Sequence, residues 1–209
     1  MQSTLIELHF LPSIEYFCAL VPFEKISLER HEHFTKQTYR NRCHILTSNG
    51  PGKLTIPLTS KHGKLMITNI RIDYTERWQD NFWRTLVSAY AKAPYFEHYA
   101  DELRKEIFYG HPFLYDLNFR LLSLCLSWLN WNKTILETDR YEKIPDSATT
   151  DLRSVISAKK DFRERNIYRP QPYQQVFGAA FSPNLSLLDL VFCAGPDCTT
   201  LVNHSGHGI

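Results

Sequence analysis

Residues 30–42 form a dense group of side chains that could bind a charged ligand. Within thirteen residues the run combines cations, histidines, a carboxylate, amides and aromatic rings: Arg30, His31, Glu32, His33, Phe34, Lys36, Gln37, Tyr39, Arg40, Asn41 and Arg42. A buried core does not need so many charges, and a solvated helix rarely interleaves two aromatic rings with them. The run therefore predicts a surface that binds a polar, anionic ligand.

The arginines of this run suit an anionic substrate. If the backbone is extended here, Arg40 and Arg42 point to one face of the strand and Asn41 points to the other. Two guanidinium groups on one face can hold a phosphate or a carboxylate through paired hydrogen bonds. The alternative is a charged strand edge that Glu29 and Glu32 neutralise. We expect Arg40, Asn41 and Arg42 to contact the substrate.

A histidine close to these cations could act as a general acid or base near neutral pH. His9 follows a predicted strand, where ligands of α/β proteins collect, and His33 lies inside the run. We expect one of them to serve as the catalytic base. Lys36 would join in binding the anion, and Phe34 and Tyr39 would pack against a ring of the substrate. The alternative for His9 is a structural hydrogen bond at the strand end.

Other reactive residues give weaker signals. On a strand His31 and His33 would share a face and could ligate zinc, but no third and fourth ligand are evident, so we predict no metal site. Cys43 follows a cation, which could activate the thiol, although its neighbours on a strand point to the other face. Asp189 lies in the apolar run LSLLDLVF, where a buried carboxylate needs a partner, and we expect an arginine.

Composition indicates a globular protein and limits its partners. The chain has 209 residues, of which 43% are hydrophobic and 13% aromatic, and its net charge is +2. That charge is too small for a nucleic-acid binder that relies on many phosphate contacts. No apolar stretch reaches the roughly 18 residues that span a bilayer, and the first residues lack the basic region of a signal peptide. The five cysteines contain no CxxC pair, so we expect buried free thiols and a cytoplasmic location.

Hydrophobic periodicity predicts mainly strands in the first third of the chain. Period-two alternation and turn residues place strands at Leu5–His9, Lys25–Arg30, Cys43–Thr47, Lys53–Leu58 and Met66–Asp73. A short helix, Ile14–Val21, separates the first two of them. The third and fourth form a hairpin around a five-residue turn at residues 48–52, and a basic turn occupies residues 61–64.

Helical spacing dominates the middle of the chain. It predicts a helical block over about residues 77–131, made of Trp78–Ala93, Tyr95–Phe108 and Phe113–Trp131. A strand at Lys133–Glu137 follows. The polar segment at about residues 139–172 is expected to be irregular, with a short helix near Asp151–Ser157 and a solvated charged run at residues 159–165.

A last helix, Leu185–Phe192, ends before a frayed tail. The order of strands, helices, strand and helix predicts one domain over residues 1–209. Its class is α/β or α+β, with a mixed, partly parallel sheet that the helical block covers.

Three motifs, in this order, resemble the WbqC-like protein family. They are HFLPSIEYF from residue 9, HEHFTKQTYRNRC with the following ILTSNG and LTIPL, and LSLLDLVFCAGP from residue 185. The resemblance covers about residues 5–202, and the second motif is similar to the branch found in Bacteroidetes-type bacteria. Members commonly carry a Gln-Pro pair where this chain has Leu8, His9 and Phe10. The prediction that His9 is catalytic therefore depends only on its position after a strand, not on the family pattern. Tyr39–Arg42 and Asp189–Pro196 match the family pattern better.

The resemblance implies a role in surface-polysaccharide biosynthesis of the O-antigen type. If the protein is an enzyme, it implies a transferase that adds an acyl or aminoacyl group to an amino sugar or nucleotide sugar. The anionic substrate would be a nucleotide sugar or an acyl group on coenzyme A or phosphopantetheine, and no cofactor is identified. The alternative is a non-catalytic binding or assembly protein that docks a protein partner through the same basic and aromatic surface.

Overall fold

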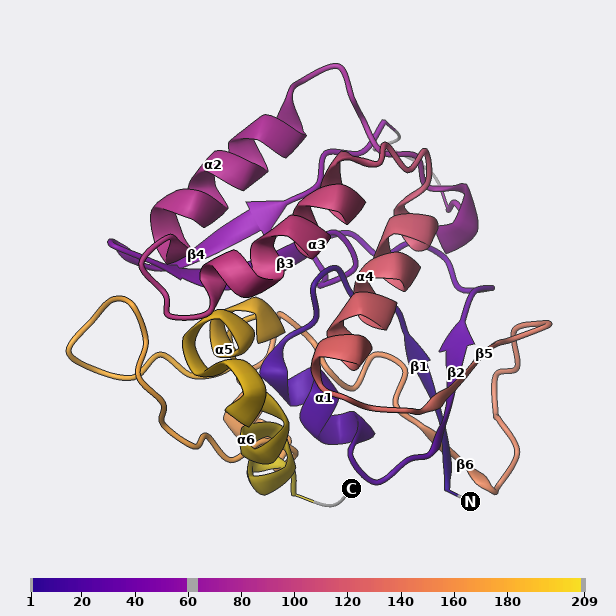
Figure 1. Ribbon diagram of the computed structural model, residues 1–209. Coiled ribbons are helices and arrows are strands. Elements are labelled where there is room, and N and C mark those ends of the chain that lie inside the picture. The colour runs from indigo at the N-terminus through magenta and orange to yellow at the C-terminus, as the bar shows by residue number, and fades with distance from the viewer. Residues whose placement is uncertain (1, 60–63, 208–209) are drawn as a thin grey trace.

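The computed structural model describes residues 2–59 and 64–207 (Figure 1). Most of the basic turn predicted at residues 61–64 lies outside this range, which includes only Lys64 of it.

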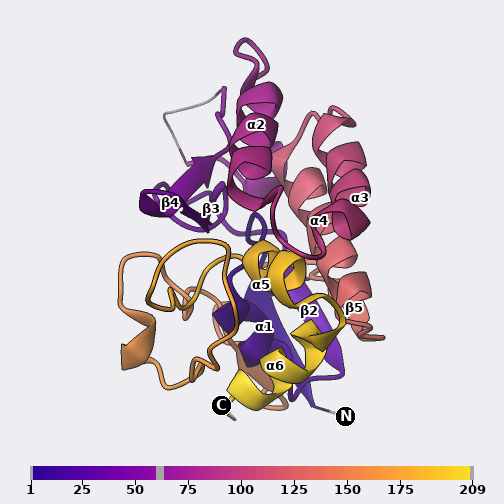
Figure 2. The same ribbon diagram turned by 60° about the vertical axis from the view of Figure 1, so that its left-hand side comes forward.

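A parallel sheet forms the lower right part of the molecule in Figure 1. Its strands lie side by side in the order β5 (Thr134–Glu137), β2 (Lys25–Glu29), β1 (Ser3–Glu7) and β6 (Thr149–Asp151). Every neighbouring pair is parallel, and Glu7 lies in register with Glu29. Helix α1 (Ile14–Leu20) carries the chain from β1 back to the start of β2, which parallel pairing requires. All its residues are buried, and it packs against the carboxyl-terminal helix α6 (Cys198–Ser205) (Figure 2).

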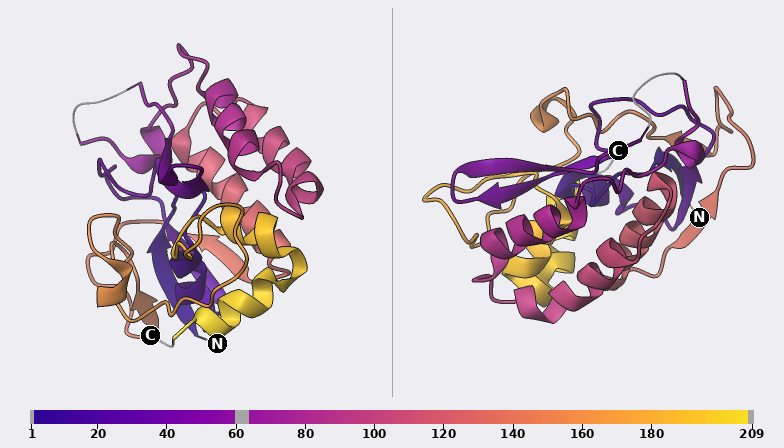
Figure 3. Two further views of the ribbon diagram at one scale, coloured as in Figure 1. Left: turned by 90° about the vertical axis from the view of Figure 1, so that its left-hand side faces the viewer. Right: turned by 90° about the horizontal axis from the view of Figure 1, so that it is seen from above.

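A separate antiparallel hairpin, β3 (Arg42–Thr47) and β4 (Gly50–Thr55), projects away from the parallel sheet (Figure 3). Thr47 pairs with Gly50, so the turn contains only Ser48 and Asn49. The five-residue turn predicted at residues 48–52 is therefore wrong. Gly50 adopts a φ of 94°, which glycine tolerates without strain, and this lets the strand begin directly after a tight turn.

Three amphipathic helices form the block predicted between residues 77 and 131. They are α2 (Trp78–Tyr90), α3 (Phe96–Phe108) and α4 (Leu114–Trp128). The buried residues of α2 recur at helical spacing along one face, beginning with Trp78, Phe82 and Leu86. This helix packs against β3, and α3 packs against both α4 and α5 (Leu187–Ala194). The block thus covers the hairpin and joins it to the carboxyl-terminal helices.

Two predicted elements are wrong, because short turns and bridges form where the sequence predicts a strand and a helix. Met66–Asp73 is not a strand: it contains a short 3-10 helix, η1 (Ile67–Asn69), and its flanking residues form single bridges to three different segments. Asp151–Ser157 is not a helix, because Thr149–Asp151 pairs with β1 as β6 and Ser154 has a φ of 60°, outside the helical range. Otherwise residues 139–172 include only a second 3-10 helix, η2 (Phe162–Glu164), as regular structure.

The carboxyl-terminal end is also more ordered than predicted. The 3-10 helix η3 (Gly195–Asp197) leads from α5 into α6, so regular structure continues to Ser205. Gly195 has a φ of 54°, and a Cβ atom there would lie 2.5 Å from the ring of Tyr95. Only glycine fits this junction without displacing Tyr95.

The architecture confirms the predicted fold class: a mixed α/β fold in which one sheet is parallel and a smaller one antiparallel. The core includes large aromatic side chains such as Phe10, Tyr16, Phe17 and Tyr90. Within the described part of the chain, every helix is too short or too polar to cross a lipid bilayer.

Candidate functional site

All four strands of the parallel sheet end on acidic residues. Glu7 ends β1, Glu29 ends β2, Glu137 ends β5 and Asp151 ends β6. Carboxyl ends of parallel strands meet at one edge of the sheet, so these four carboxylates lie along that edge. Glu7 and Glu29 are almost completely buried. Buried carboxylates need partners, and the chain supplies them from two loops.

Arg40 supplies the first partner. Its Nε and Nη2 atoms lie 2.7 and 2.5 Å from the two carboxylate oxygens of Glu32, and Nη2 lies 3.5 Å from Glu7. Burial alone would lower the pKa of Arg40, but the hydrogen bonds to Glu32 and the charge of Glu7 raise it. Arg40 is therefore a fixed cation, held between two carboxylates rather than open to solvent.

Arg153 supplies the second partner, from the loop after β6. Its Nη1 lies 2.9 Å from Glu29, and its Nε and Nη2 bind the two oxygens of Asp151 at 2.9 and 2.7 Å. The next residue, Ser154, donates its backbone N–H to Glu7 at 2.9 Å. The positive φ of Ser154 turns the chain so that consecutive residues reach two different strand ends.

Above these ion pairs lies a cavity of about 430 Å³, within the range of small-molecule sites. We call it the strand-end cavity, and it is lined by His31, Glu32, His33, Thr35, Arg40, Tyr141, Arg153 and Ser154. The guanidinium of Arg153 lies 4.9 Å from the ring centre of Tyr141, whose side chain is 54% exposed. The cavity thus has polar, charged walls and one accessible aromatic face.

The charge of this cluster does not favour an anion. Two arginines, Arg40 and Arg153, are held by four carboxylates, those of Glu7, Glu29, Glu32 and Asp151. With all four ionised and the histidines neutral, the cluster carries a net charge of minus two. A ligand with amino or hydroxyl groups fits such a cavity better than a phosphate does.

His9 lies beneath the cavity, not in its lining. Its Nε2 lies 3.4 Å from Glu7, and its ring packs against Tyr16 and Tyr39 at 4.9 and 5.3 Å between centroids. Burial lowers the pKa of His9, so the ring is neutral and Nε2–H donates to Glu7. Its Nδ1 has no hydrogen-bond partner within the described residues. In this structure His9 positions Glu7.

Glu7 is the ionised centre of the cluster. Burial alone would raise its pKa, but the hydrogen bond from His9, the charge that His9 gains at low pH and the charge of Arg40 lower it to about 2. Glu32 differs, because burial raises its pKa in spite of its contact with Arg40. Two acidic groups beside one arginine therefore differ in how readily they take up a proton.

The two histidines of the run line the cavity in different ways. His31 is fixed: its Nε2 lies 2.9 Å from the carbonyl oxygen of Thr138, to which it donates, and its backbone N–H donates to Glu29. His33 is exposed and bridges Met66 through its backbone. Among residues 2–59 and 64–207, His, Cys, Asp and Glu nowhere gather in a group of three that could hold a metal ion.

The other predicted substrate-binding residues line a different cavity. Phe34, Lys36, Asn41 and Arg42 lie on a cavity of about 460 Å³, which we call the hairpin cavity because Thr55–Leu58, at and beyond the end of β4, form its opposite wall. Arg40 and Arg42 thus do not share a face as the sequence suggests. The reason is that the strand begins only at Arg42, after turns at residues 36–40 and a φ of 59° at residue 37.

Two of the predicted residues have structural contacts. Tyr39 is buried between His9 and His44, and its backbone oxygen accepts a hydrogen bond from Phe10. Asn41 donates through Nδ2 to the carbonyl oxygen of Ile56, which extends the pairing of the hairpin by one step. Both residues therefore hold the run against its surroundings.

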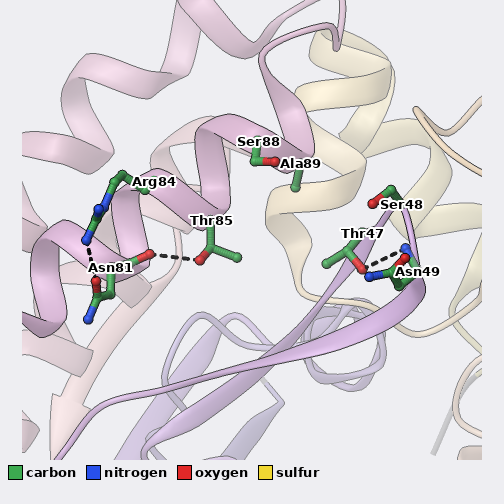
Figure 4. Close-up of a pocket in the computed structure, with 8 residues that line it drawn as sticks. All are labelled: Thr47, Ser48, Asn49, Asn81, Arg84, Thr85, Ser88 and Ala89. Atoms are coloured by element: carbon green, nitrogen blue, oxygen red, sulfur yellow. Dashed lines mark hydrogen bonds between the residues drawn. The ribbon is translucent and has the colours of Figure 1, made fainter.

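A larger cavity, of about 690 Å³, lies between the hairpin turn and α2 (Figure 4). It is lined by small polar side chains and by Arg84, which donates to Asn81 at 2.6 Å. It contains neither a carboxylate nor a histidine, and none of the residues predicted from sequence lines it. The strand-end cavity, which has both kinds of group, is the better candidate for chemistry.

Two further predictions are settled by burial. Cys43 is buried, and burial raises the pKa of its thiol, which disfavours the nucleophilic thiolate. Asp189 is indeed a buried carboxylate, but the predicted arginine partner is wrong. It accepts hydrogen bonds from Tyr90, Tyr173 and Gln175 at 2.8, 2.6 and 2.8 Å.

Sequence reasoning missed Arg153 and Tyr141 as members of the site. Both lie in the segment predicted to be irregular, and Arg153 is 124 residues from its partner Glu29. The one signal in the sequence was an acid and a base two positions apart, Asp151 and Arg153.

Comparison with known proteins places the chain among its relatives. A sequence profile of the WbqC-like protein family matches residues 8–169. The chain belongs to the WbqC-like protein family. It is also similar to the uncharacterized protein Rv1507c of Mycobacterium tuberculosis, with 28% identity over 222 residues, covering 92% of this chain and 94% of that protein. No solved structure matches it. The family match begins one residue after Glu7 and includes all eight residues that line the strand-end cavity.

Proposed function

We propose that this WbqC-like protein is a transferase of surface-polysaccharide assembly. It adds an acyl or aminoacyl group to an amino sugar that binds in the strand-end cavity. The observation that carries the proposal is the pairing of a net negative charge with an accessible ring in one cavity. An amino sugar offers a positive group, several hydroxyls and an apolar ring face. The carboxylates would attract the positive group, the polar walls would bind the hydroxyls, and Tyr141 would pack against the apolar ring face.

His33 would act as the base. An ammonium group must lose a proton before its nitrogen can attack, and His33 is an exposed imidazole in the cavity lining that can accept it. The amine nitrogen then forms a bond to the carbonyl carbon of a thioester donor, and the carbon–sulfur bond breaks. The nitrogen loses a second proton to water as the amide forms, and the proton taken by His33 passes to the departing thiolate, so charge and atoms balance.

Lys36 and Arg42 would contact the anionic part of the donor. Both are cations that line the hairpin cavity together with two carboxylates, Asp73 and Glu76, and both lie on the loop that also lines the strand-end cavity. A phosphate of coenzyme A, of phosphopantetheine or of a nucleotide is the group that such cations recognise. The loop of residues 31–42 therefore contributes side chains to both proposed subsites.

The test measures binding of glucosamine to the purified protein by calorimetry, with Tyr141→Ala as the site variant. Ile144→Ala is the matched control, because Ile144 lies in the same loop and is 84% exposed. We expect Tyr141→Ala to weaken binding by about tenfold, the contribution of one aromatic contact, and Ile144→Ala to leave it unchanged. Equal binding by all three proteins would place the sugar elsewhere, and no binding at all would overturn the proposal.

A second measurement tests the chemistry. Mixed with glucosamine and acetyl coenzyme A, the protein should form an N-acetylated product detectable by mass spectrometry. His33→Gln should lower the rate by about 100-fold or more, as expected for loss of a general base. A rate unaffected by this change would remove His33 from the mechanism.

A docking function is the second candidate, because Tyr141 and Ile144 are large, exposed side chains in one loop beside the cavity. A protein partner that binds stoichiometrically, and is lost with both Tyr141→Glu and Ile144→Glu, would favour docking. If Tyr141→Glu abolishes sugar binding and Ile144→Glu does not, the result favours the transferase.

A further inference from the structure

A second cavity lies near the same edge of the parallel sheet. It measures about 450 Å³, and we call it the aromatic cleft. Its lining comes from the end of α3, from α4 and from the end of β5: Tyr109, His111, Pro112, Tyr115, Asp116, Phe119, Arg120 and Glu137. Nothing in the transferase proposal above uses these residues.

One residue connects the aromatic cleft to the strand-end cavity. Glu137 lines the cleft, and the following residue, Thr138, accepts the hydrogen bond from His31, which lines the strand-end cavity. The hydroxyl of Thr138 also donates to Glu29 at 3.0 Å. The two cavities therefore lie over neighbouring strand ends. The aromatic cleft lies at the end of β5, and the strand-end cavity lies at the ends of β2, β1 and β6.

The side chains of the cleft combine rings with polar groups at its rim. Tyr109 is 76% exposed, and its ring lies 4.6 Å from that of His111. Asp116 and Arg120 are exposed and form no ion pair within the described residues. Aromatic rings beside a few polar groups in a concave surface are typical of a ligand site. A pyranose ring has the matching surface, with an apolar face and a hydroxyl rim.

The charge of the cleft does not favour an anionic polymer. Its two carboxylates, Asp116 and Glu137, are matched by two arginines, Arg120 in the lining and Arg30, which pairs with Glu137 at 3.3 Å. A polyphosphate or nucleic acid would need an excess of cations. A neutral or amino-substituted sugar chain needs none.

We propose that the acceptor is the terminal amino sugar of an oligosaccharide, with the preceding sugar units bound in the aromatic cleft. This inference rests on the proposed transferase function and adds the class of acceptor: a chain rather than a free monosaccharide. The terminal unit occupies the strand-end cavity, and the chain leads past Thr138 onto the ring of Tyr109.

The experiment measures affinity as a function of chain length. Glucosamine and its β-1,4-linked oligomers, from the dimer to the hexamer, are titrated into the full protein by calorimetry. We expect the oligomers to bind about tenfold more tightly than glucosamine, the gain of one added aromatic contact. Tyr109→Ala should abolish this gain and leave the affinity for glucosamine unchanged, while Tyr109→Phe, which keeps the ring, should retain it. Because Tyr109 is exposed, the alanine variant should fold normally, which its melting temperature verifies.

The outcomes separate this inference from the transferase proposal. If glucosamine binds and chain length has no effect, or if the gain survives in Tyr109→Ala, the cleft is not a sugar subsite and the transferase proposal stands. If neither glucosamine nor any oligomer binds, both are overturned.

Discussion

The guanidinium group of Arg165 holds the carboxylate of Glu15 at two points, across a separation of 150 residues. The two distances are 2.6 and 2.7 Å, and both side chains are shielded from water. Asn184 adds a third hydrogen bond to Glu15 at 3.0 Å. This contact fixes the irregular segment of residues 139–172 to α1, and it shows that the charged run predicted to be solvated at residues 159–165 has one buried member.

Replacing Arg165 should therefore be costly. Arg165→Ala leaves the carboxylate of Glu15 buried with only Asn184 as partner, and we expect a loss of about 3–5 kcal/mol in the free energy of unfolding. Urea denaturation measures this loss. Arg163→Ala is the matched control, because Arg163 is exposed and its contacts with Asp161 and the ring of Phe162 lie at the surface, so its loss should stay within about 0.5 kcal/mol. Equal losses would mean that the Glu15 contact is not maintained in solution.

The free energy of unfolding should decrease in two steps as the pH is lowered, the first caused by His9 and the second by Glu7. The folded-state pKa of His9 lies below its ordinary 6.5, so its contribution is present above pH 6.5 and is lost as the pH falls below that value. The pKa of Glu7 is lowered from 4.5 to about 2, so its contribution, on the order of 3 kcal/mol, is present above pH 4.5 and is lost between pH 4.5 and 2.

Variants assign each step. His9→Gln keeps a donor near Glu7 but cannot titrate, and it should flatten the stability profile just below pH 6.5. Glu7→Gln should flatten it between pH 4.5 and 2. Unfolding free energies at closely spaced pH values give the profile. A His9→Gln protein with the wild-type slope around pH 6 would contradict a neutral, buried His9.

Asp189 should tolerate an amide far better than an alanine. Asp189→Ala leaves three donors, on Tyr90, Tyr173 and Gln175, without their acceptor in a buried site. At about 1–3 kcal/mol for each unsatisfied group, we expect a loss of at least 3 kcal/mol in urea denaturation. Asp189→Asn keeps one acceptor oxygen and should lose about half as much. Equal losses in the two variants would show that packing, not hydrogen bonding, matters at this position.

The five cysteines should resist modification in the folded protein. All are free and buried, and burial raises the pKa of each thiol, for example that of Cys193 to about 12. We expect an aromatic disulfide reagent at pH 8 to label none of them within minutes in buffer and all five in denaturant. Fast labelling of Cys43 in buffer would restore the nucleophile hypothesis that its burial disfavours.

Local patterns predicted the elements that carry strong periodicity. The period of the apolar side chains located α2, α3 and α4, and β2 and β5, to within a few residues. Strand β6 was missed because Thr149–Asp151 has no apolar residue and gains its structure from pairing with β1. Helix α6 was missed because it is short and polar, and packing against α1 stabilises it.

The candidate site was predictable only in part. The run of residues 30–42 does line two cavities, yet its conformation there depends on Glu7 and Glu32, which bind Arg40 from before and within the run. Arg40 and Arg42 would share a face only if the strand included both residues, but the turn before Arg42 leaves Arg40 outside it. Arg153 joins through a contact between distant segments, which a single sequence does not reveal.

Buried carboxylates near the amino terminus bind partners that are synthesised much later, and this affects how the chain folds during synthesis. Glu7, Glu29 and Glu15 each obtain one of their partners from residues 153–165, and one edge of β1 stays unpaired until β6 exists. On the ribosome the amino-terminal part therefore emerges with acidic groups and a strand edge that nothing yet covers. Its final structure has to wait until residue 165 has left the exit tunnel, so protection of the nascent chain by chaperones should strongly affect its yield.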